Sequence, residues 1–143
     1  MFDIEKGCGW ETISKQKRPF VGCDLWVVGF ECDSISSLNT KASENRLCCE
    51  EGVGKTGATS RGTLMYVKKH RPRFLALEHE KNLPAKDKHD PEGRSNLTIL
   101  LIKFNKDGYL SYSSVQNALV YGSREREQRA DLDFVLPHFR FPR

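Results

Sequence analysis

Long hydrophobic runs are missing from this sequence. A helix that spans a bilayer needs about 20 consecutive apolar residues, and no run in this chain approaches that length. The first residues, MFDIEKGCGWET, also lack the apolar core of an export signal. We therefore expect no membrane partner and an intracellular location.

Cysteine occurs in a pattern that disfavours its common structural uses. The five cysteines are an odd number without an export signal, which disfavours a secreted disulfide framework. Cys48 and Cys49 are adjacent and no C-x-x-C or H-x-x-x-H pair occurs, so we expect no metal site. A reducing compartment fits this pattern. No clear Lys/Arg-rich import cluster decides between nucleus and cytoplasm.

The length and the net charge of the chain limit the number of domains and the kinds of partner that we expect. A chain of 143 residues buries at most one core, so we expect one domain over residues 1–143. The 23 Lys and Arg residues against 19 Asp and Glu residues leave a formal net charge of +4. This charge permits an anionic partner but does not require one.

Three short apolar runs predict the core of an α/β fold: Leu25–Phe30, Phe74–Leu77 and Leu97–Phe104. Near-continuous apolar runs are typical of strands covered on both faces, as in a mostly parallel sheet. The third run also suits a helix that ends at the Asp107-Gly108 turn. The segment SYSSVQNALVYG suits a polar strand or a short helix, and we expect the charged tail after it to be solvated surface.

The region between the first two runs predicts a crossover. RGTLMYVKKHRP has the composition of a helix that ends before Pro72. A strand, helix and strand in this order form a right-handed unit whose strands are parallel. Cys32 and Glu78, which follow the two strands, are therefore expected at the same edge of the sheet, where a thiol and a carboxylate support nucleophilic chemistry.

Three blocks of sequence carry a family resemblance. They are DLWVVGFECDSIS, GTLMYVKKHRPRFLALEHEKNL and LLIKFNKDGYLSYSSVQNALVYGSREREQR. In order, over about residues 24–129, they resemble the cytosine-5 DNA methyltransferase motifs G-F-P-C-Q-x-x-S, R-P-x-x-x-x-x-E-N-V-x-x-L and G-Y-x-x-x-x-x-x-x-N-A-x-x-Y-G-x-P-Q-x-R-x-R. The matching anchors are Gly29, Phe30, Cys32, Ser36, Arg71, Pro72, Glu78, Asn82, Leu83, Gly108, Tyr109, Asn117, Ala118, Tyr121, Gly122 and Arg129.

The resemblance implies a fold, a reaction and a set of roles. It implies a truncated Rossmann-like methyltransferase domain with a mostly parallel sheet, S-adenosylmethionine as methyl donor and a cytosine flipped out of DNA as substrate. Cys32 would add to carbon-6 of the ring, Glu78 would hold and protonate N3, and Arg129 would face the thiolate or the base carbonyl. One branch of the family modifies transfer RNA with the same motifs, so RNA is the alternative substrate.

Several positions depart from the family pattern. Glu31 and Asp33 flank Cys32 in place of Pro and Gln, and two carboxylates beside a thiol should raise its pKa. His79 replaces an Asn whose amide helps to fix the nucleophile loop. Only the Gly7-Cys8-Gly9 triplet resembles the glycine turn that binds the donor, and a DNA-reading domain is not recognisable, so a partner chain would have to supply the missing segments. The alternative is a non-catalytic nucleic-acid or protein-binding remnant of the family.

The polar segment between the first strand and the helix allows two interpretations. Gly54-Lys55-Thr56 resembles the end of a phosphate-binding loop, but Cys49 stands where that motif requires its first glycine. This third hypothesis, nucleotide hydrolysis, would gain support if the triplet opened a helix directly after a strand. In the methyltransferase interpretation, four cations of the segment contact DNA phosphates, with solvated surface charge as the equal alternative: Lys41, Arg46, Lys55 and Arg61.

Overall fold

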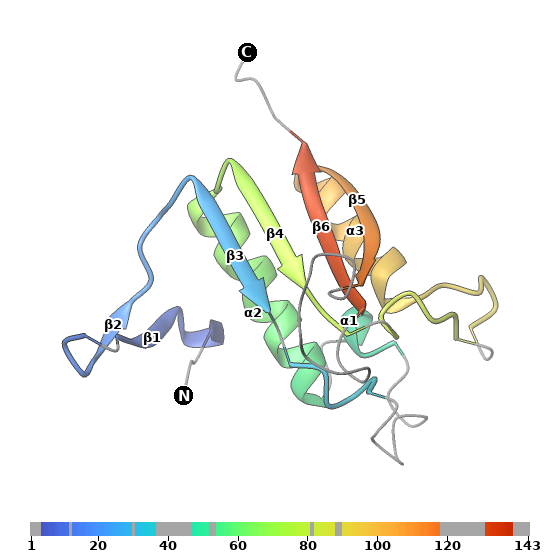
Figure 1. The fold of residues 1–143 in the computed structure, drawn as a ribbon, viewed down its shortest axis with the longest axis horizontal. Coiled ribbons are helices and arrows are strands. Elements are labelled where there is room, and N and C mark those ends of the chain that lie inside the picture. Colours follow the sequence, from blue (N-terminus) through green and yellow to red (C-terminus); the bar gives the residue numbers. More distant parts are fainter. Residues whose placement is uncertain are drawn as a thin grey trace.

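A computed structural model describes residues 4–11, 13–29, 31–36, 47–51, 54–80, 82–87, 90–117 and 131–138. The elements form a four-stranded sheet with helices packed on it and a separate N-terminal hairpin (Figure 1). In chain order they are η1 (Ile4–Lys6), β1 (Cys8–Glu11), β2 (Gln16–Pro19), β3 (Leu25–Gly29), α1 (Cys48–Glu51), α2 (Gly54–His70), β4 (Phe74–Glu78), α3 (Asn96–Lys106), β5 (Leu110–Asn117) and β6 (Asp131–His138).

The main sheet is mixed, with the strand order β3-β4-β6-β5. β3 and β4 pair in parallel, as the sequence predicts, while β6 runs antiparallel to both of its neighbours. The α/β class and one parallel pair are therefore confirmed, but the adjacent strands are not mostly parallel. The prediction failed because β6 lies in the charged tail, where we expected no strand. Its segment DLDFVLPH alternates polar and apolar residues at the start, which is a strand pattern.

The third apolar run, Leu97–Phe104, is helical and forms most of α3. Ser95 caps this helix, because its side chain accepts a hydrogen bond from the backbone N–H of Thr98. The buried face of α3 carries Leu97, Leu100 and Phe104 at helical spacing. The segment after the Asp107-Gly108 turn forms β5, so of the two alternatives there the strand is correct.

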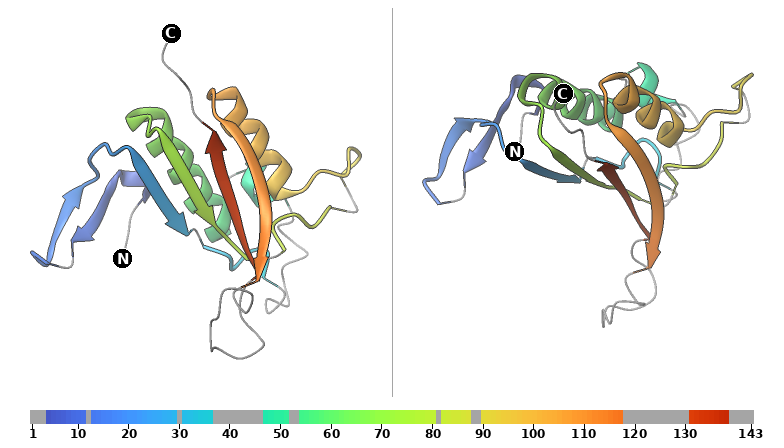
Figure 2. Two further views of the ribbon diagram at one scale, coloured as in Figure 1. Left: turned by 45° about the horizontal axis from the view of Figure 1, so that its top comes forward. Right: turned by 90° about the horizontal axis from the view of Figure 1, so that it is seen from above.

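α2 lies with α3 on one face of the sheet (Figure 2). It ends at His70, before Pro72, as predicted. Its buried face is lined largely by small residues such as Gly57, Ser60 and Gly62, which permit a close approach to neighbouring elements. The side chains of Leu75 and Leu77 from β4 are buried in the same core.

The other face of the sheet is open at β3. Leu25 and Val27 are 56% and 64% exposed, whereas Trp26 and Val28 alternate with them and pack against the core. β3 is also one of the two edge strands of the sheet that the structure describes. An apolar edge strand with one uncovered face presents both backbone groups and side chains for pairing.

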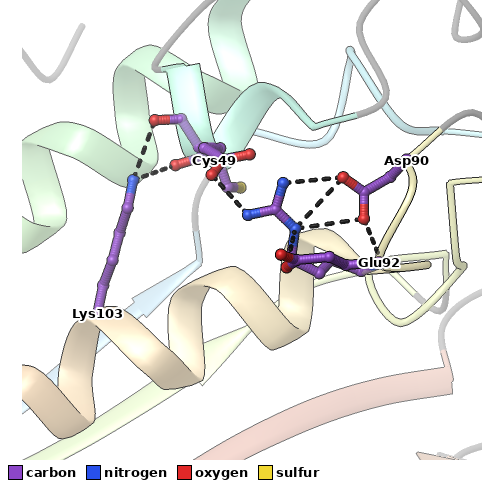
Figure 3. Close-up of polar contacts among 6 residues, drawn as sticks. Cys49, Asp90, Glu92 and Lys103 are labelled. Carbon is purple, nitrogen blue, oxygen red and sulfur yellow. Dashed lines mark hydrogen bonds and ion pairs between the residues drawn. The ribbon is translucent and has the colours of Figure 1, made fainter.

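A polar network joins α1, the loop before α3, and α3 itself (Figure 3). The Lys103 ammonium donates to the carbonyl oxygens of Cys49 and Glu50, at 2.5 and 3.2 Å. Arg94 pairs with Glu50 at 2.8 Å and with Asp90 at 2.8 Å. The short helix α1 is thus tied to α3 through its carbonyl end as well as by packing. In the part of the chain that the structure describes, no helix is long and apolar enough to cross a membrane.

Candidate functional site

The carboxyl ends of β3 and β4 meet at one edge of the sheet. The parallel ladder pairs Leu25 with Phe74 at one end and Gly29 with Glu78 at the other. The segment that carries Cys32 therefore leaves the sheet beside Glu78, as the crossover argument predicted. The Glu78 carboxylate lies over Gly29, with Oε2 only 2.7 Å from the point that a Cβ on Gly29 would occupy.

The segment after β3 forms a tight turn around Cys32. The backbone N–H groups of Ile35 and Ser36 both donate to the carbonyl of Cys32, at 3.0 and 2.9 Å. Two threonines of α2 hold this turn from the helix side. Thr59 Oγ1 accepts from the N–H of Glu31 at 3.2 Å, and Thr56 Oγ1 accepts from the N–H of Ser34 at 3.1 Å.

The segment after β4 holds the same turn from the other side. The Nε2 atom of His79 lies 3.3 Å from the carbonyl oxygen of Glu31, and the Asn82 amide donates to the carbonyl of Ile35 at 3.3 Å. His79, which stands where the family pattern has Asn, therefore contacts the Cys32 turn. Sequence reasoning missed this role of His79, and it also missed Thr56 and Thr59. Their spacing of three on α2 was the available signal.

The surroundings of Cys32 disfavour its thiolate. The pKa of the thiol is raised, first by burial, then by the carboxylates of Glu80 and Glu31, with Asp33 a smaller contributor. The predicted direction is confirmed, but the largest charge effect comes from Glu80, which the sequence analysis did not single out. Oε2 of Glu80 is buried and accepts no hydrogen bond from the described residues.

Asp33 is compensated by a cation. Lys55 pairs with the Asp33 carboxylate at 2.5 Å, and its ammonium lowers the pKa of Asp33. Because both side chains are largely exposed, this pair is screened by solvent. Lys55 is thus oriented toward the Cys32 turn. Arg61 lies on the exposed side of α2.

The remaining predicted site residues lie outside the described part of the chain. Arg129 is one of them, and so are Lys41 and Arg46. The same holds for the motif anchors Phe30, Ala118, Tyr121 and Gly122. The roles that the resemblance implies for these residues stay predictions.

The structure meets only one of the two conditions of the phosphate-loop hypothesis, which required a helix that begins at the triplet and a strand directly before it. Gly54, with a φ of 65°, does open α2, so Gly54-Lys55-Thr56 begins a helix. The element before it is the helix α1, not a strand. Lys55 and Thr56 are also engaged by Asp33 and Ser34. This arrangement does not favour a loop whose amides cradle phosphate.

The described residues do not fit S-adenosylmethionine. Gly7 and Gly9 belong to the start of the hairpin, where β1 pairs only with β2 and lies outside the four-stranded sheet. A donor-binding glycine turn would have to follow a strand of that sheet and open a helix. No group of three or more His, Cys, Asp or Glu side chains that could hold a metal ion occurs among the described residues.

Comparisons with known proteins add no family assignment. No model of a protein family matches the chain, and a search of curated proteins finds no match.

Proposed function

We propose that this chain is a DNA (cytosine-5) methyltransferase-like protein that attacks a flipped cytosine through Cys32. The observation that carries the proposal is the parallel register of β3 and β4, which brings the Cys32 turn and Glu78 to one edge of the sheet. The three motifs that resemble the family supply the chemical interpretation of these two residues. Transfer from S-adenosylmethionine to carbon-5 is the overall reaction proposed.

The proposed chemistry of the chain's own residues is a covalent addition. The Cys32 thiolate donates an electron pair to carbon-6 of the cytosine, and the electrons of the 5,6 double bond make carbon-5 nucleophilic. A proton or hydrogen bond from the Glu78 carboxyl at N3 neutralises the charge that builds on the ring. Arg61 on α2 is proposed to contact the phosphates of DNA or of RNA, and so is Lys55, which would exchange its exposed pair with Asp33 for a phosphate.

A partner chain belongs to the same proposal, because the described residues do not fit the methyl donor. The open edge of β3 and the exposed side chains of Leu25 and Val27 support it. A strand added beside β3 would extend the sheet sideways, and one of its ends would lie next to the turn that carries Cys32. Covering the open face would also remove apolar side chains from water.

Covalent trapping tests the proposed reaction. The chain is incubated with S-adenosylmethionine and DNA that contains 5-fluorocytosine, and a denaturant-resistant adduct is sought by mass. Once carbon-5 has received the methyl group, its fluorine cannot leave as a proton does, so the covalent adduct is expected to persist. The adduct should be absent in Cys32→Ser. Folded wild-type protein that binds the DNA yet forms no adduct would overturn catalysis by this chain without a partner.

A second candidate, a non-catalytic nucleic-acid or protein-binding remnant, is favoured by a specific observation. Burial and the Glu80 and Glu31 carboxylates raise the pKa of Cys32, which reduces the thiolate available at neutral pH. For this candidate, Cys32→Ser should leave DNA binding unchanged. Binding that survives this substitution, without an adduct in the wild type, would support the remnant.

A further inference from the structure

The imidazole of His79 bridges the two segments that carry Cys32 and Glu78. His79 follows Glu78 directly, and its side chain is only 2% exposed. Nε2 lies 3.3 Å from the carbonyl oxygen of Glu31, the residue before Cys32. A buried imidazole that reaches a backbone carbonyl of another segment fixes the distance between the two segments.

The hydrogen bonds around the ring assign its tautomer. The backbone N–H of Glu80 donates to Nδ1 of His79 at 2.8 Å, so Nδ1 is an acceptor and carries no proton. The proton of the neutral ring is then on Nε2, which can donate to the carbonyl of Glu31. The longer approach of Nδ1 to the carbonyl of Glu80, 3.4 Å, is the weaker of the two contacts at that atom.

From this arrangement we infer that His79 is a positioning residue for Cys32, which it holds through the Glu31 carbonyl. The N–H of Glu31 is already bound by Thr59 of α2. With His79 on the carbonyl, both backbone polar groups of Glu31 are held, one from the helix and one from the end of β4. The backbone that enters Cys32 therefore has little freedom to rotate. That the positioning of Cys32 promotes methyl transfer rests on the proposed function. The positioning itself rests only on the hydrogen bonds of Glu31.

The charges around His79 make its protonation state responsive to pH. Burial lowers its pKa. The contacts of the ring with the carbonyls of Glu80 and Glu31, and then the carboxylates of Glu78 and Glu80, oppose this effect without cancelling it. The ring is therefore neutral at pH 7. When the ring is protonated in acid, it loses the hydrogen bond from the N–H of Glu80, but Nε2 then donates a charge-assisted and therefore stronger hydrogen bond to the carbonyl of Glu31.

Site-resolved alkylation of the full chain tests this inference without DNA or a methyl donor. Iodoacetamide, a small neutral reagent, is used on wild type, His79→Leu and His79→Gln, and each cysteine is quantified by peptide mass. In His79→Leu, the rate at Cys32 should rise about fivefold, which corresponds to the loss of ~1 kcal/mol from one hydrogen bond. In His79→Gln, whose amide nitrogen can donate at the position of Nε2, the rate should stay within about twofold of wild type.

Cys48 and Cys49 report on global opening in the same samples, because both are buried in the core. Their rates should not change in either variant. Equal increases at Cys32 and at these two cysteines, in both variants, would show a role in stability alone and overturn the inference. So would an unchanged rate at Cys32 in His79→Leu.

The pH profile adds a readout that a space-filling role would not affect. The logarithm of the Cys32 rate should rise in proportion to pH while the thiolate fraction grows. In wild type, the rate in acid should fall below this line, because the protonated His79 ring holds the Glu31 carbonyl more strongly. In His79→Gln, the line should remain straight. A straight line in wild type as well would count against the inference, and failure of covalent trapping would not bear on this result.

Discussion

The carboxylate of Glu78 occupies the space in which a side chain on Gly29 would lie. Its Oε2 atom is 2.7 Å from the position of a Cβ at Gly29, across the last pair of the β3–β4 ladder. Such an approach is too close for any carbon atom. The absence of a side chain at position 29 therefore sets where the Glu78 carboxylate rests at the sheet edge.

Gly29→Ala should displace the Glu78 carboxylate with little loss of stability. The atom that clashes is the end of a flexible side chain, so we expect a change of less than about 1 kcal/mol in the free energy of unfolding. The yield of the trapped DNA adduct should fall severalfold. Gly22→Ala is the matched control, since a Cβ there would meet the His70 ring at an ordinary 3.7 Å. An unchanged adduct yield in Gly29→Ala would show that this carboxylate position is not required.

Glu31→Gln should make Cys32 more reactive. The Glu31 carboxylate contributes to the raised pKa of the thiol after burial and Glu80. Removing one nearby charge should increase the alkylation rate at pH 8 about twofold to fivefold at low salt, with a smaller effect in 1 M salt. The control is Glu92→Gln, a change at an exposed carboxylate that pairs with Arg94. Identical rates in Glu31→Gln and wild type would contradict the electrostatic account.

Asn96→Ala should destabilise the chain by detaching α1 from α3. Asn96 is 3% exposed, and its Oδ1 accepts from the N–H of Cys49 at 2.9 Å. Leaving this buried N–H unpaired should cost about 1–3 kcal/mol in the free energy of unfolding, measured by urea denaturation. Alkylation of Cys49 should also accelerate. Asn105→Ala, at an exposed position of the same helix, should have a much smaller effect, and equal effects of the two would refute the assignment.

The Asp90–Arg94 pair should make stability depend on acid pH. Hydrogen bonds from Arg94 lower the pKa of Asp90 from its ordinary 3.8 to about 2. Because the folded pKa is the lower one, the stabilisation is present above the ordinary value and is lost as pH falls from about 4 toward 2. Thermal unfolding across this range should show the loss in wild type and a weaker dependence in Asp90→Asn. Parallel curves for the two proteins would exclude this pair as the source.

Local sequence patterns were sufficient to predict the helix α3 but not the strand β6. The run Leu97–Phe104 allowed a strand or a helix, and the turn that follows it favoured the helix that is observed. β6 was not predicted because the tail that contains it is dense in charge and because one of its partners, β4, is distant in the chain. Its insertion beside β4 makes the sheet mixed. Pairing of this kind depends on which edge is left open after the other elements have packed.

The sequence by itself determined the β3, α2, β4 unit and the placement of Cys32 and Glu78 at one sheet edge. Apolar runs, the proline that follows the helix and the handedness of crossovers are sufficient for that result. Only the tertiary structure decided what holds and surrounds Cys32. Thr59 and His79 reach Glu31 from 28 and 48 positions away in the chain. Glu80, which is also remote in sequence, is the carboxylate that affects the thiol most. Such contacts arise from the packing of a helix and a strand end around one turn. The spacing of Thr56 and Thr59 puts both on one side of α2, but it does not say which backbone groups they bind.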